Sequence, residues 1–369
     1  MNILFLHLCD AHIKETTKAD DINVNALVRS LTQMGHFDEV FLFFSGDITQ
    51  SGELNEYKAA KAILGNIIKQ IKDKYCFQKR VHTFIIPGNH DLKHGTNILK
   101  REAIVESYKV ETHEDLFSNE LLKLNNFFEF ARYNKCFQNS DVIDIFQFDA
   151  GDGFNIRINL INTAPFSLKG GTNADKGLHY LPTSALDRLN NVSNEKYTIS
   201  ILHHSPEWFK DSIKNTLYES LHKHSDLVFI GHDHMSKMEK KIVDSQYAVD
   251  YLAGIPLHGV SEEKGYTAFI LDTKNSTIEG KLFSKNGSIY KPTTVLDKHV
   301  IKFREKKAFA FNDEFKNYLI KDEGERVGQN FYDYFVFPEL EETKFDEELK
   351  KKELFDESDF LRFCDGKNV

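Results

Sequence analysis

The stretch that decides the fold is Ile3-Leu4-Phe5-Leu6-His7-Leu8-Cys9-Asp10-Ala11-His12, an apolar run that ends in polar residues. Two similar runs follow at residues 40–44 and 81–86, and each ends in a turn-forming cluster. Short apolar runs of this kind are typical of strands buried on both faces. Residues 23–34 and 55–71 carry apolar side chains at helical spacing, so the first 91 residues predict strand, helix, strand, helix, strand.

The rest of the chain predicts more strands, a helical insert and a tail. Strands are expected at residues 156–161, 198–202, 227–230, 247–252, 266–272 and 277–284. The last of these follow one another without helices, so part of the sheet should be mixed or antiparallel. Residues 92–150 are predicted to be mostly helical and to pack over one sheet edge through an apolar face made of Leu121, Leu122, Leu124, Phe127, Phe128, Phe130, Tyr133 and Phe137. A charged extension, rich in Glu and Lys at residues 344–360, begins after about residue 300 and should be helical.

Composition limits the class of protein. A chain of 369 residues with 41% hydrophobic and 28% charged residues is globular, of one large or two smaller domains. The net charge of −9 comes without a basic stripe, which argues against tight nucleic-acid binding but does not exclude a nuclease. The four cysteines (Cys9, Cys76, Cys136 and Cys364) have no CxxC spacing and are expected to be reduced. With neither a signal peptide nor a run of about 20 apolar residues, the sequence predicts a cytoplasmic protein without membrane contact.

Polar residues of metal-ligand type follow five predicted strands, where open α/β sheets place their sites. The clusters are Asp10-Ala11-His12, Gly46-Asp47, Gly88-Asn89-His90-Asp91, His203-His204 and Gly231-His232-Asp233-His234. Any one of them alone is more often a turn or an ordinary histidine pair. Together they supply the mixed oxygen and nitrogen donors that two divalent cations need.

This set resembles the calcineurin-like metallophosphoesterase superfamily, whose D-x-H, GD, GNH-D/E, H and G-H-x-H motifs occur here in order across residues 1–285. The resemblance implies an α/β fold: a two-layered sandwich of mixed β-sheets flanked by helices over residues 1–300, with the helical insert at about 92–150 and an extension at 301–369. It implies that one metal is bound by Asp10, His12 and His234, the other by Asn89, His203 and His232, and that Asp47 bridges them. His90 would be the catalytic histidine, oriented by Asp91.

The chemistry expected from this resemblance is phosphodiester hydrolysis by a metal-bound hydroxide. Two divalent cations polarise a phosphoryl oxygen and lower the pKa of a shared water from 15.7 towards 7. His90 can donate a proton to the leaving oxygen. Manganese is the metal that we expect, and iron and zinc also suit the ligand set.

The substrate is predicted from two further motifs. Residues 46–57, Gly46-Asp47-Ile48-Thr49-Gln50-Ser51-Gly52-Glu53-Leu54-Asn55-Glu56-Tyr57, resemble the signature of the cyclic-nucleotide phosphodiesterase-like branch, and His203-His204-Ser205-Pro206 resembles its HHxP motif. The GDxVDRG motif of the protein phosphatases is missing. A nucleotide, cyclic nucleotide or related phosphodiester is therefore favoured. Two alternatives stay open: a DNA or RNA nuclease of the same superfamily, and an effector or regulatory module of a larger defence-type assembly.

The remaining histidines and the tail carry weaker expectations. His204 should support the site without binding a metal, and Asp233 should turn outward. His7, His36 and His82 are expected to be ordinary core or surface residues, and His94, His179 and His258 to lie near the site without touching substrate. The extension at 301–369 is expected to be a solvated terminal helix or linker, to bind a protein partner, or to pack on its own domain.

Overall fold

The computed structural model describes residues 1–75, 81–94, 105, 120–138, 142–151, 153–168, 174–190, 195–234, 237–242 and 248–301. All of them belong to the first of the two units into which the chain divides, residues 1–306. The charged extension predicted after residue 300 lies outside the described residues, apart from Ile301. No helix in the described part of the chain combines the length and apolarity that a membrane span requires.

The described residues form thirteen strands and several helices. The strands are β1 (Asn2–Leu8), β2 (Glu39–Ser45), β3 (Val81–Ile86), β4 (Phe137–Gln138), β5 (Ile143–Asp149), β6 (Asn155–Ile161), β7 (Tyr197–Leu202), β8 (Leu227–Ile230), β9 (Lys237–Ile242), β10 (Ala248–Ala253), β11 (Gly265–Asp272), β12 (Thr277–Asn286) and β13 (Ile289–Val300). The α-helices are α1 (Ala19–Ile22), α2 (Val24–Ser30), α3 (Leu54–Tyr75), α6 (Asn125–Tyr133), α7 (Thr183–Asn190) and α8 (Asp211–His224). Short 3₁₀ helices lie at Leu31–Met34, Asn89–Asp91, Leu122–Leu124, Ala164–Phe166 and Pro206–Trp208.

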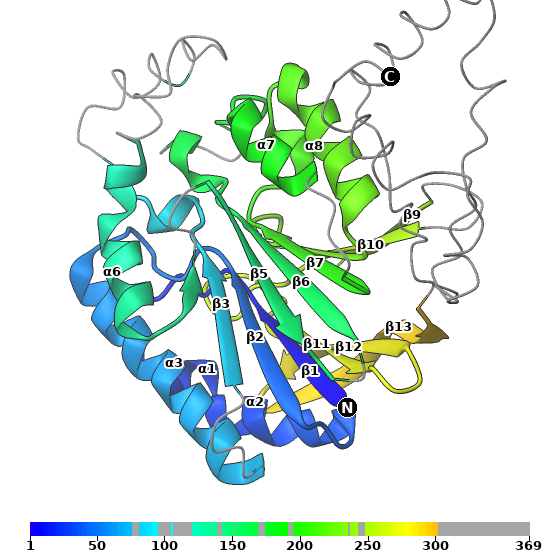
Figure 1. Cartoon of the computed structure of the whole chain (residues 1–369). Helices are drawn as coiled ribbons and strands as arrows, with labels where there is room; N and C mark the ends of the chain where they lie inside the picture. The colour runs from blue at the N-terminus through cyan, green and yellow to red at the C-terminus, as the bar shows by residue number, and fades with distance from the viewer. Residues whose placement is uncertain are drawn as a thin grey trace, which may run out of the picture. The chain divides into compact units, whose positions relative to one another are not determined.

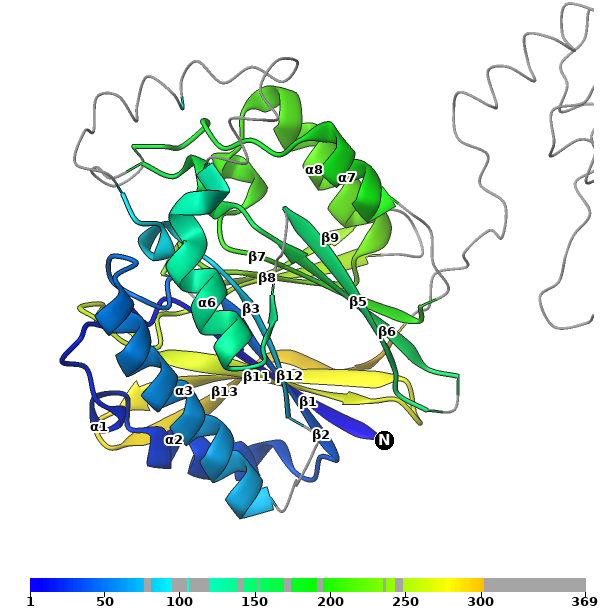
Figure 2. The ribbon, with the colours of Figure 1, turned by 60° about the vertical axis from the view of Figure 1, so that its left-hand side comes forward.

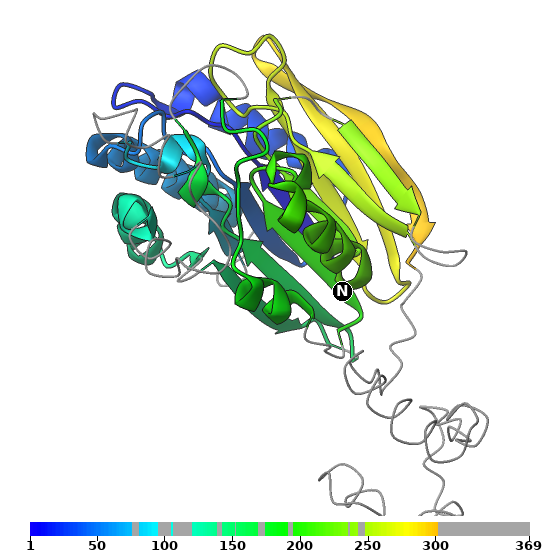
Figure 3. The ribbon, with the colours of Figure 1, turned by 90° about the horizontal axis from the view of Figure 1, so that it is seen from above.

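Two mixed sheets pack face to face, and helices cover the outer face of each (Figures 1 and 2). The first sheet has the strand order β13-β12-β11-β1-β2-β3-β4, and the second has the order β5-β6-β7-β8-β10-β9. Helices α1 to α3 and α6 lie against the first sheet, while α7 and α8 lie over the second, as the view from above in Figure 3 shows. The predicted α/β sandwich of mixed sheets flanked by helices is confirmed.

The layer between the sheets is aromatic. Phe43 of the first sheet lies 5.7 Å from Phe5 of the neighbouring strand and 5.3 Å from Phe229 of the second sheet, measured between ring centroids. Aromatic pairs at this spacing contribute about 0.5–1.5 kcal/mol beyond their buried area. The two outer layers use mainly aliphatic side chains, such as Leu27 and Ile67 under the first sheet and Leu217 over the second.

Part of the segment 92–150 is not helical as predicted. Helix α6 is present, and its Phe130 packs against Tyr57 of α3 at 5.2 Å. Residues 143–149, however, form β5, which pairs antiparallel with β6 at the edge of the second sheet. The run Ile143-Asp-Ile-Phe-Gln-Phe-Asp has apolar residues on both faces of the strand: Ile143 and Ile145 pack on one side, and Phe146 and Phe148 pack in the layer between the sheets. The helical prediction is therefore wrong for this part.

Strand register brings the predicted ligand loops to one edge of the sandwich. In the first sheet, β1, β2 and β3 run parallel, with Leu8 opposite Phe44 and Ser45 opposite Ile86. In the second sheet, β7 and β8 run parallel, with Leu202 opposite Ile230. The carboxyl ends of these five strands therefore all open onto the same edge, as expected of an α/β sheet.

Candidate metal centre

The backbone at the predicted ligands is held in a costly conformation. Asp10, His12, Asp47, His232 and His234 have φ values of 49°, 43°, 53°, 68° and 54°. They account for five of the eight non-glycine residues with positive φ in the described part of the chain. Such conformations cost about 1–3 kcal/mol each and persist where the surrounding structure enforces them, often at functional sites. The strain thus coincides with the residues chosen from sequence motifs.

Backbone hydrogen bonds tie the loops after β1 and β2 together. The backbone nitrogen of Asp10 donates to the carbonyl of Gly46 at 3.1 Å. The nitrogens of Ala11 and His12 both donate to the carbonyl of Asp47, at 2.8 and 3.0 Å. The turns that carry Asp10, His12 and Asp47 are therefore one rigid unit.

A first triad, Asp10, His12 and His234, brings its ligand atoms within 4.8 Å of one another. Nε2 of His12 lies 3.3 Å from Nε2 of His234, which in turn lies 3.3 Å from Oδ1 of Asp10. Two imidazole nitrogens and a carboxylate oxygen at this spacing can share one divalent cation. The structure thus brings together the three residues predicted for one metal.

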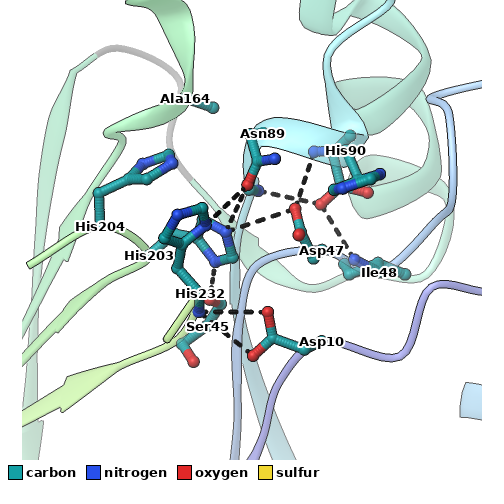
Figure 4. A network of polar contacts seen from close by, with 12 residues as sticks. Asp10, Ser45, Asp47, Ile48, Asn89, His90, Ala164, His203, His204 and His232 are labelled. Atoms are coloured by element: carbon teal, nitrogen blue, oxygen red, sulfur yellow. Dashed lines mark hydrogen bonds and ion pairs between the residues drawn. The ribbon is translucent and has the colours of Figure 1, made fainter. Parts of the chain in front are cut away.

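A second triad, Asn89, His203 and His232, is centred on the side-chain oxygen of Asn89 (Figure 4). This oxygen lies 2.9 Å from Nε2 of His203 and 3.0 Å from Nδ1 of His232. Nδ1 of His203 donates to the carbonyl of Ser45 at 2.8 Å, and a carbonyl can only accept. In the neutral ring Nε2 therefore keeps its lone pair, which is the arrangement of a metal-binding histidine.

Asp47 lies between the two triads. Its Oδ2 is 3.9 Å from Nε2 of His12, and its Oδ1 is 3.4 Å from Nε2 of His203. The two oxygens of one carboxylate thus face one residue of each triad, which is the position that a bridging ligand requires.

The electrostatics of the site favour a bound cation. Asp10 and Asp47 are 0% and 1% exposed. Burial by itself would raise the pKa of Asp47, but the charge and hydrogen bond of His203 hold it well below its usual value. Burial likewise disfavours charge on His203, yet Asp47 raises the pKa of that imidazole to about 9. Buried carboxylates are tolerated when they are paired or coordinate a metal, and these two are placed to do either.

Three glycines leave the space that the ligand side chains occupy. A Cβ on Gly88 would lie 2.2 Å from Oδ1 of Asp47, and one on Gly46 would lie 2.4 Å from Nδ1 of His203. A Cβ on Gly231 would meet the same nitrogen at 2.7 Å. The glycines before the ligands are therefore needed for close packing at Asp47 and His203, and Gly46, with a φ of 93°, also for its turn.

His90 is placed beside the first triad. Its ring centroid lies 4.6 Å from that of His12, and its backbone nitrogen donates to Oδ1 of Asp47 at 2.8 Å. Nδ1 lies 2.7 Å from the carbonyl oxygen of Gln50, which can only accept, so this nitrogen carries a proton. Nε2 is then the ring atom left to exchange a proton with a substrate.

The carboxylate of Asp91, which is expected to orient His90, is surrounded by hydrogen-bond donors. Its carboxylate accepts hydrogen bonds from the backbone nitrogens of Ile48, Thr49 and Gly88 and from the hydroxyls of Thr49 and Tyr57, each at 3.0 Å. These donors lie in the loops after β2 and β3 and in helix α3. Asp91 therefore joins the two ligand loops, and the carbonyl of Gln50, rather than Asp91, contacts the ring of His90.

Trp208 and Thr163 lie close to the centre although no sequence motif marks them, and His179 is one of the histidines expected near the site. Trp208 packs edge-on against His232 at 4.2 Å between centroids, and it is the chain's single tryptophan. Nδ1 of His179 lies 2.9 Å from the carbonyl of Thr163, and Nε2 lies 3.2 Å from Oδ2 of Asp175. Nothing in the local sequence pairs Thr163 with His179, because folding brings them together from different loops.

The other histidines and Asp233 fall into simple classes. Nε2 of His94 contacts the carbonyl of Asn89, and Nδ1 of His258 contacts that of Ala11, so both contact ligand loops. His7 is buried between Thr267 and Ser45. His82 is half-buried, and His36 and Asp233 are exposed.

Of the cysteines, Cys9 and Cys136 carry free thiols, whereas Cys76 and Cys364 lie outside the described residues.

Comparison with known proteins places this fold and site in a family. The model of the calcineurin-like phosphoesterases matches residues 3–236, and the chain belongs to this family of metal-dependent phosphoesterases. A probable cyclic nucleotide phosphodiesterase of Vesicomyosocius okutanii subsp. Calyptogena okutanii is 30% identical over 96 residues. That alignment covers 26% of this chain and 36% of the relative, so the chain matches little more than a third of that protein's length.

Solved structures with similarity to the chain are distant. Vacuolar protein sorting 29 from Cryptosporidium parvum aligns with 82% of this chain and 100% of its own, at 11% identity and a TM-score of 0.36. A conserved uncharacterized protein from Streptococcus pneumoniae, a predicted phosphoesterase, aligns with 80% of this chain and 98% of its own, at 10% identity and a TM-score of 0.29.

Proposed function

We propose that the chain is a phosphodiesterase with a dinuclear metal centre, acting on a nucleotide, a cyclic nucleotide or a related diester. The observation that carries this proposal is the position of Asp47, whose two carboxylate oxygens face His12 of one triad and His203 of the other. Membership of the calcineurin-like phosphoesterase family supports the reaction class.

The residues present fit two divalent cations. Each triad offers mixed oxygen and nitrogen donors, and the two buried carboxylates supply the negative charge that cations neutralise. When bound, such a pair of cations polarises a phosphoryl oxygen and activates a water near neutral pH. Manganese is our first expectation, with iron and zinc also suited to these donors.

The protein's own contribution to the reaction is positioning and proton transfer. Asp47 and the two triads would fix the ions, and the backbone hydrogen bonds between the turns would hold the ligand side chains in place. With both ring nitrogens protonated, His90 would give the Nε2 proton to the leaving oxygen and keep the Nδ1 proton, which is hydrogen-bonded to the carbonyl of Gln50. A histidine in this role contributes about 10² to 10⁴ in rate.

The substrate class is supported by the segment after β2. Thr49 and Tyr57, both in the segment that resembles the cyclic-nucleotide phosphodiesterase-like branch, donate hydrogen bonds to Asp91 and so connect this segment to Asn89 and His90. The relative named a probable cyclic nucleotide phosphodiesterase points to the same class, over its 96 aligned residues.

The test is a screen of the purified full chain loaded with Mn²⁺. Cyclic nucleotides, a chromogenic aryl phosphodiester, single- and double-stranded DNA, and RNA should be assayed before and after exhaustive EDTA treatment. We expect EDTA-sensitive hydrolysis of small diesters that added Mn²⁺ restores, and none by Asp47→Asn. Cleavage of nucleic acid alone would favour the nuclease alternative, and activity that survives EDTA would refute the metal-dependent mechanism.

A further inference from the structure

We propose that His204 is an additional metal ligand, which donates Nε2 to the ion held by the second triad. This inference rests on the metal centre of the proposed function. It adds a residue to the expected ligand set, in which the second histidine of the His203-His204 pair was only a supporting residue.

The position of His204 fits this role. Ligand atoms of His203, His204 and His232 lie within 4.8 Å of one another. The ring centroid of His204 is 4.7 Å from that of His203 and 4.6 Å from that of His232, and Figure 4 shows the three rings side by side. Two nitrogens bound to one metal at about 2.0–2.1 Å each can be up to about 4.2 Å apart, so a small closure around an ion would bring all three into its shell.

One nitrogen of His204 is engaged and the other is not. Nδ1 lies 2.9 Å from the hydroxyl oxygen of Thr163, and this oxygen accepts the backbone N–H of His204 at 3.1 Å. Nε2 is buried and has no hydrogen-bond partner among the described residues. Metal-binding histidines commonly donate one ring N–H to a fixed acceptor while the other nitrogen binds the ion. Thr163 can be that acceptor.

Two other buried histidines among the described residues, His7 and His179, use both ring nitrogens. His179 contacts Thr163 through Nδ1 and Asp175 through Nε2. His7 contacts Thr267 through Nδ1 and Ser45 through Nε2. His204 is as deeply buried as these two residues, with 0% of its surface exposed, yet its Nε2 is unpaired. A buried polar atom without a partner is costly, so this nitrogen calls for a ligand that the protein itself does not supply.

The ring of His204 is also prevented from turning away. The ring of His179 packs on it at 4.0 Å between centroids, and Trp208 lies 5.7 Å from it. His179 is in turn held by Thr163 and Asp175, so the orientation of His204 is set by neighbours from two other loops. These neighbours therefore fix the orientation of the His204 ring beside the second triad.

An extra imidazole would make the two sites chemically different. The second site would then have three histidine nitrogens with Asn89 and Asp47, whereas the first has two histidines with Asp10 and Asp47. Nitrogen-rich sites suit Zn²⁺, Co²⁺ and Fe²⁺, and oxygen-rich sites suit Mn²⁺. The second site should accordingly prefer Zn²⁺ or Co²⁺ over Mn²⁺.

The test is titration of the metal-free full chain with Co²⁺, followed by calorimetry and by visible absorption. The wild type should bind two ions in two steps. His204→Gln should retain one step and weaken the other by about tenfold to a hundredfold or more, with a changed absorption spectrum, because the cobalt bands report the number and type of donors. The exposed control His36→Gln should leave both steps unchanged.

Thr163→Val serves as a second variant, since it keeps the shape of the side chain and removes only the acceptor. It should weaken the same step by about tenfold, in the range seen when the partner of a metal-binding histidine is lost. Should His204→Gln fail to fold, an unchanged binding step and spectrum in Thr163→Val would overturn the proposal. Two unchanged steps in folded His204→Gln would overturn it as well, while leaving the dinuclear centre intact. A wild type that binds no Co²⁺ would instead refute the proposed metal centre itself.

Discussion

The carboxylate of Asp91 accepts hydrogen bonds from both the backbone nitrogen and the hydroxyl of Thr49, at 3.0 Å each. Asp91 follows β3 and Thr49 follows β2, so this contact joins the loop that carries Asn89 to the loop that carries Asp47. One residue of the second triad and the carboxylate between the triads are thus held at a fixed separation by a residue that reaches neither of the expected ions.

Asp91→Ala should therefore act on stability and metal binding together. It removes the acceptor of three backbone N–H groups and two hydroxyls, and stranded buried donors cost about 1–3 kcal/mol each before relaxation. We expect the free energy of unfolding to fall by at least about 3 kcal/mol, and the metal content to fall with it. Denaturant unfolding and elemental analysis check this. If the variant keeps its stability and metals but loses turnover as His90→Ala does, Asp91 acts through His90 after all.

Gly88→Ala should disturb the site through Asp47. The added Cβ would lie 2.2 Å from Oδ1 and 2.4 Å from the backbone nitrogen of Asp47, so that carboxylate must move. We expect a loss of bound metal, measured per chain after dialysis. The matched control is Gly65→Ala, in the exposed face of α3 with no atom within 4 Å of the new Cβ, which should stabilise the protein by about 0.5–1 kcal/mol. Equal metal content in both variants would contradict the packing argument.

His90→Ala should keep its metals and lose about 10² to 10⁴ in rate. The loss should be smaller for an activated aryl diester than for a diester with a nucleoside leaving group, because a good leaving group needs little proton donation. Steady-state rates on the two substrates decide the matter. Equal losses would indicate that His90 binds the phosphoryl group and does not act as the acid.

The buried His7 predicts a pH dependence of stability. Burial lowers its pKa to about 3 in the folded protein, partly offset by Asp10, while the unfolded value is about 6.5. Protons therefore bind the unfolded chain more tightly than the folded one. The contribution of neutral His7 to the free energy of unfolding is complete above about pH 6.5 and is lost as the pH falls towards 3.

Between pH 7 and pH 5, the free energy of unfolding should fall by about 2 kcal/mol more in the wild type than in His7→Gln. The reason is that pH 5 lies about 1.5 units below the pKa of His7 in the unfolded chain, and each unit corresponds to about 1.4 kcal/mol. Other buried histidines are present in both proteins and cancel in the comparison. Parallel pH curves for the two proteins would show that His7 is not held neutral by burial.

The sequence predicts the centre of the fold better than its edges. The apolar runs of β1, β2 and β3 are buried on both faces, so hydrophobicity alone marks them. β9 (Lys-Met-Glu-Lys-Lys-Ile) and β13 lie at sheet edges and carry charged side chains, which blunt edges against unwanted pairing but also hide the strand signal.

The candidate site, too, can be predicted from the sequence only in part. The residues of the two triads could be named because each follows a strand directly and carries a ligand-type side chain. The hydrogen bonds of Asp91 and His204 could not, because their partners Tyr57 and Thr163 are 34 and 41 residues away in the chain. A local motif specifies a residue type at a strand end, but not the donor that folding brings to it.

The most direct test of the account is the anomalous diffraction signal of crystals of the full chain grown with Mn²⁺. We predict two peaks about 3.5–4 Å apart, on either side of the carboxylate of Asp47, one within reach of Asp10, His12 and His234 and the other within reach of Asn89, His203 and His232. A single peak, or two peaks of which Asp47 touches only one, would contradict the bridged dinuclear centre.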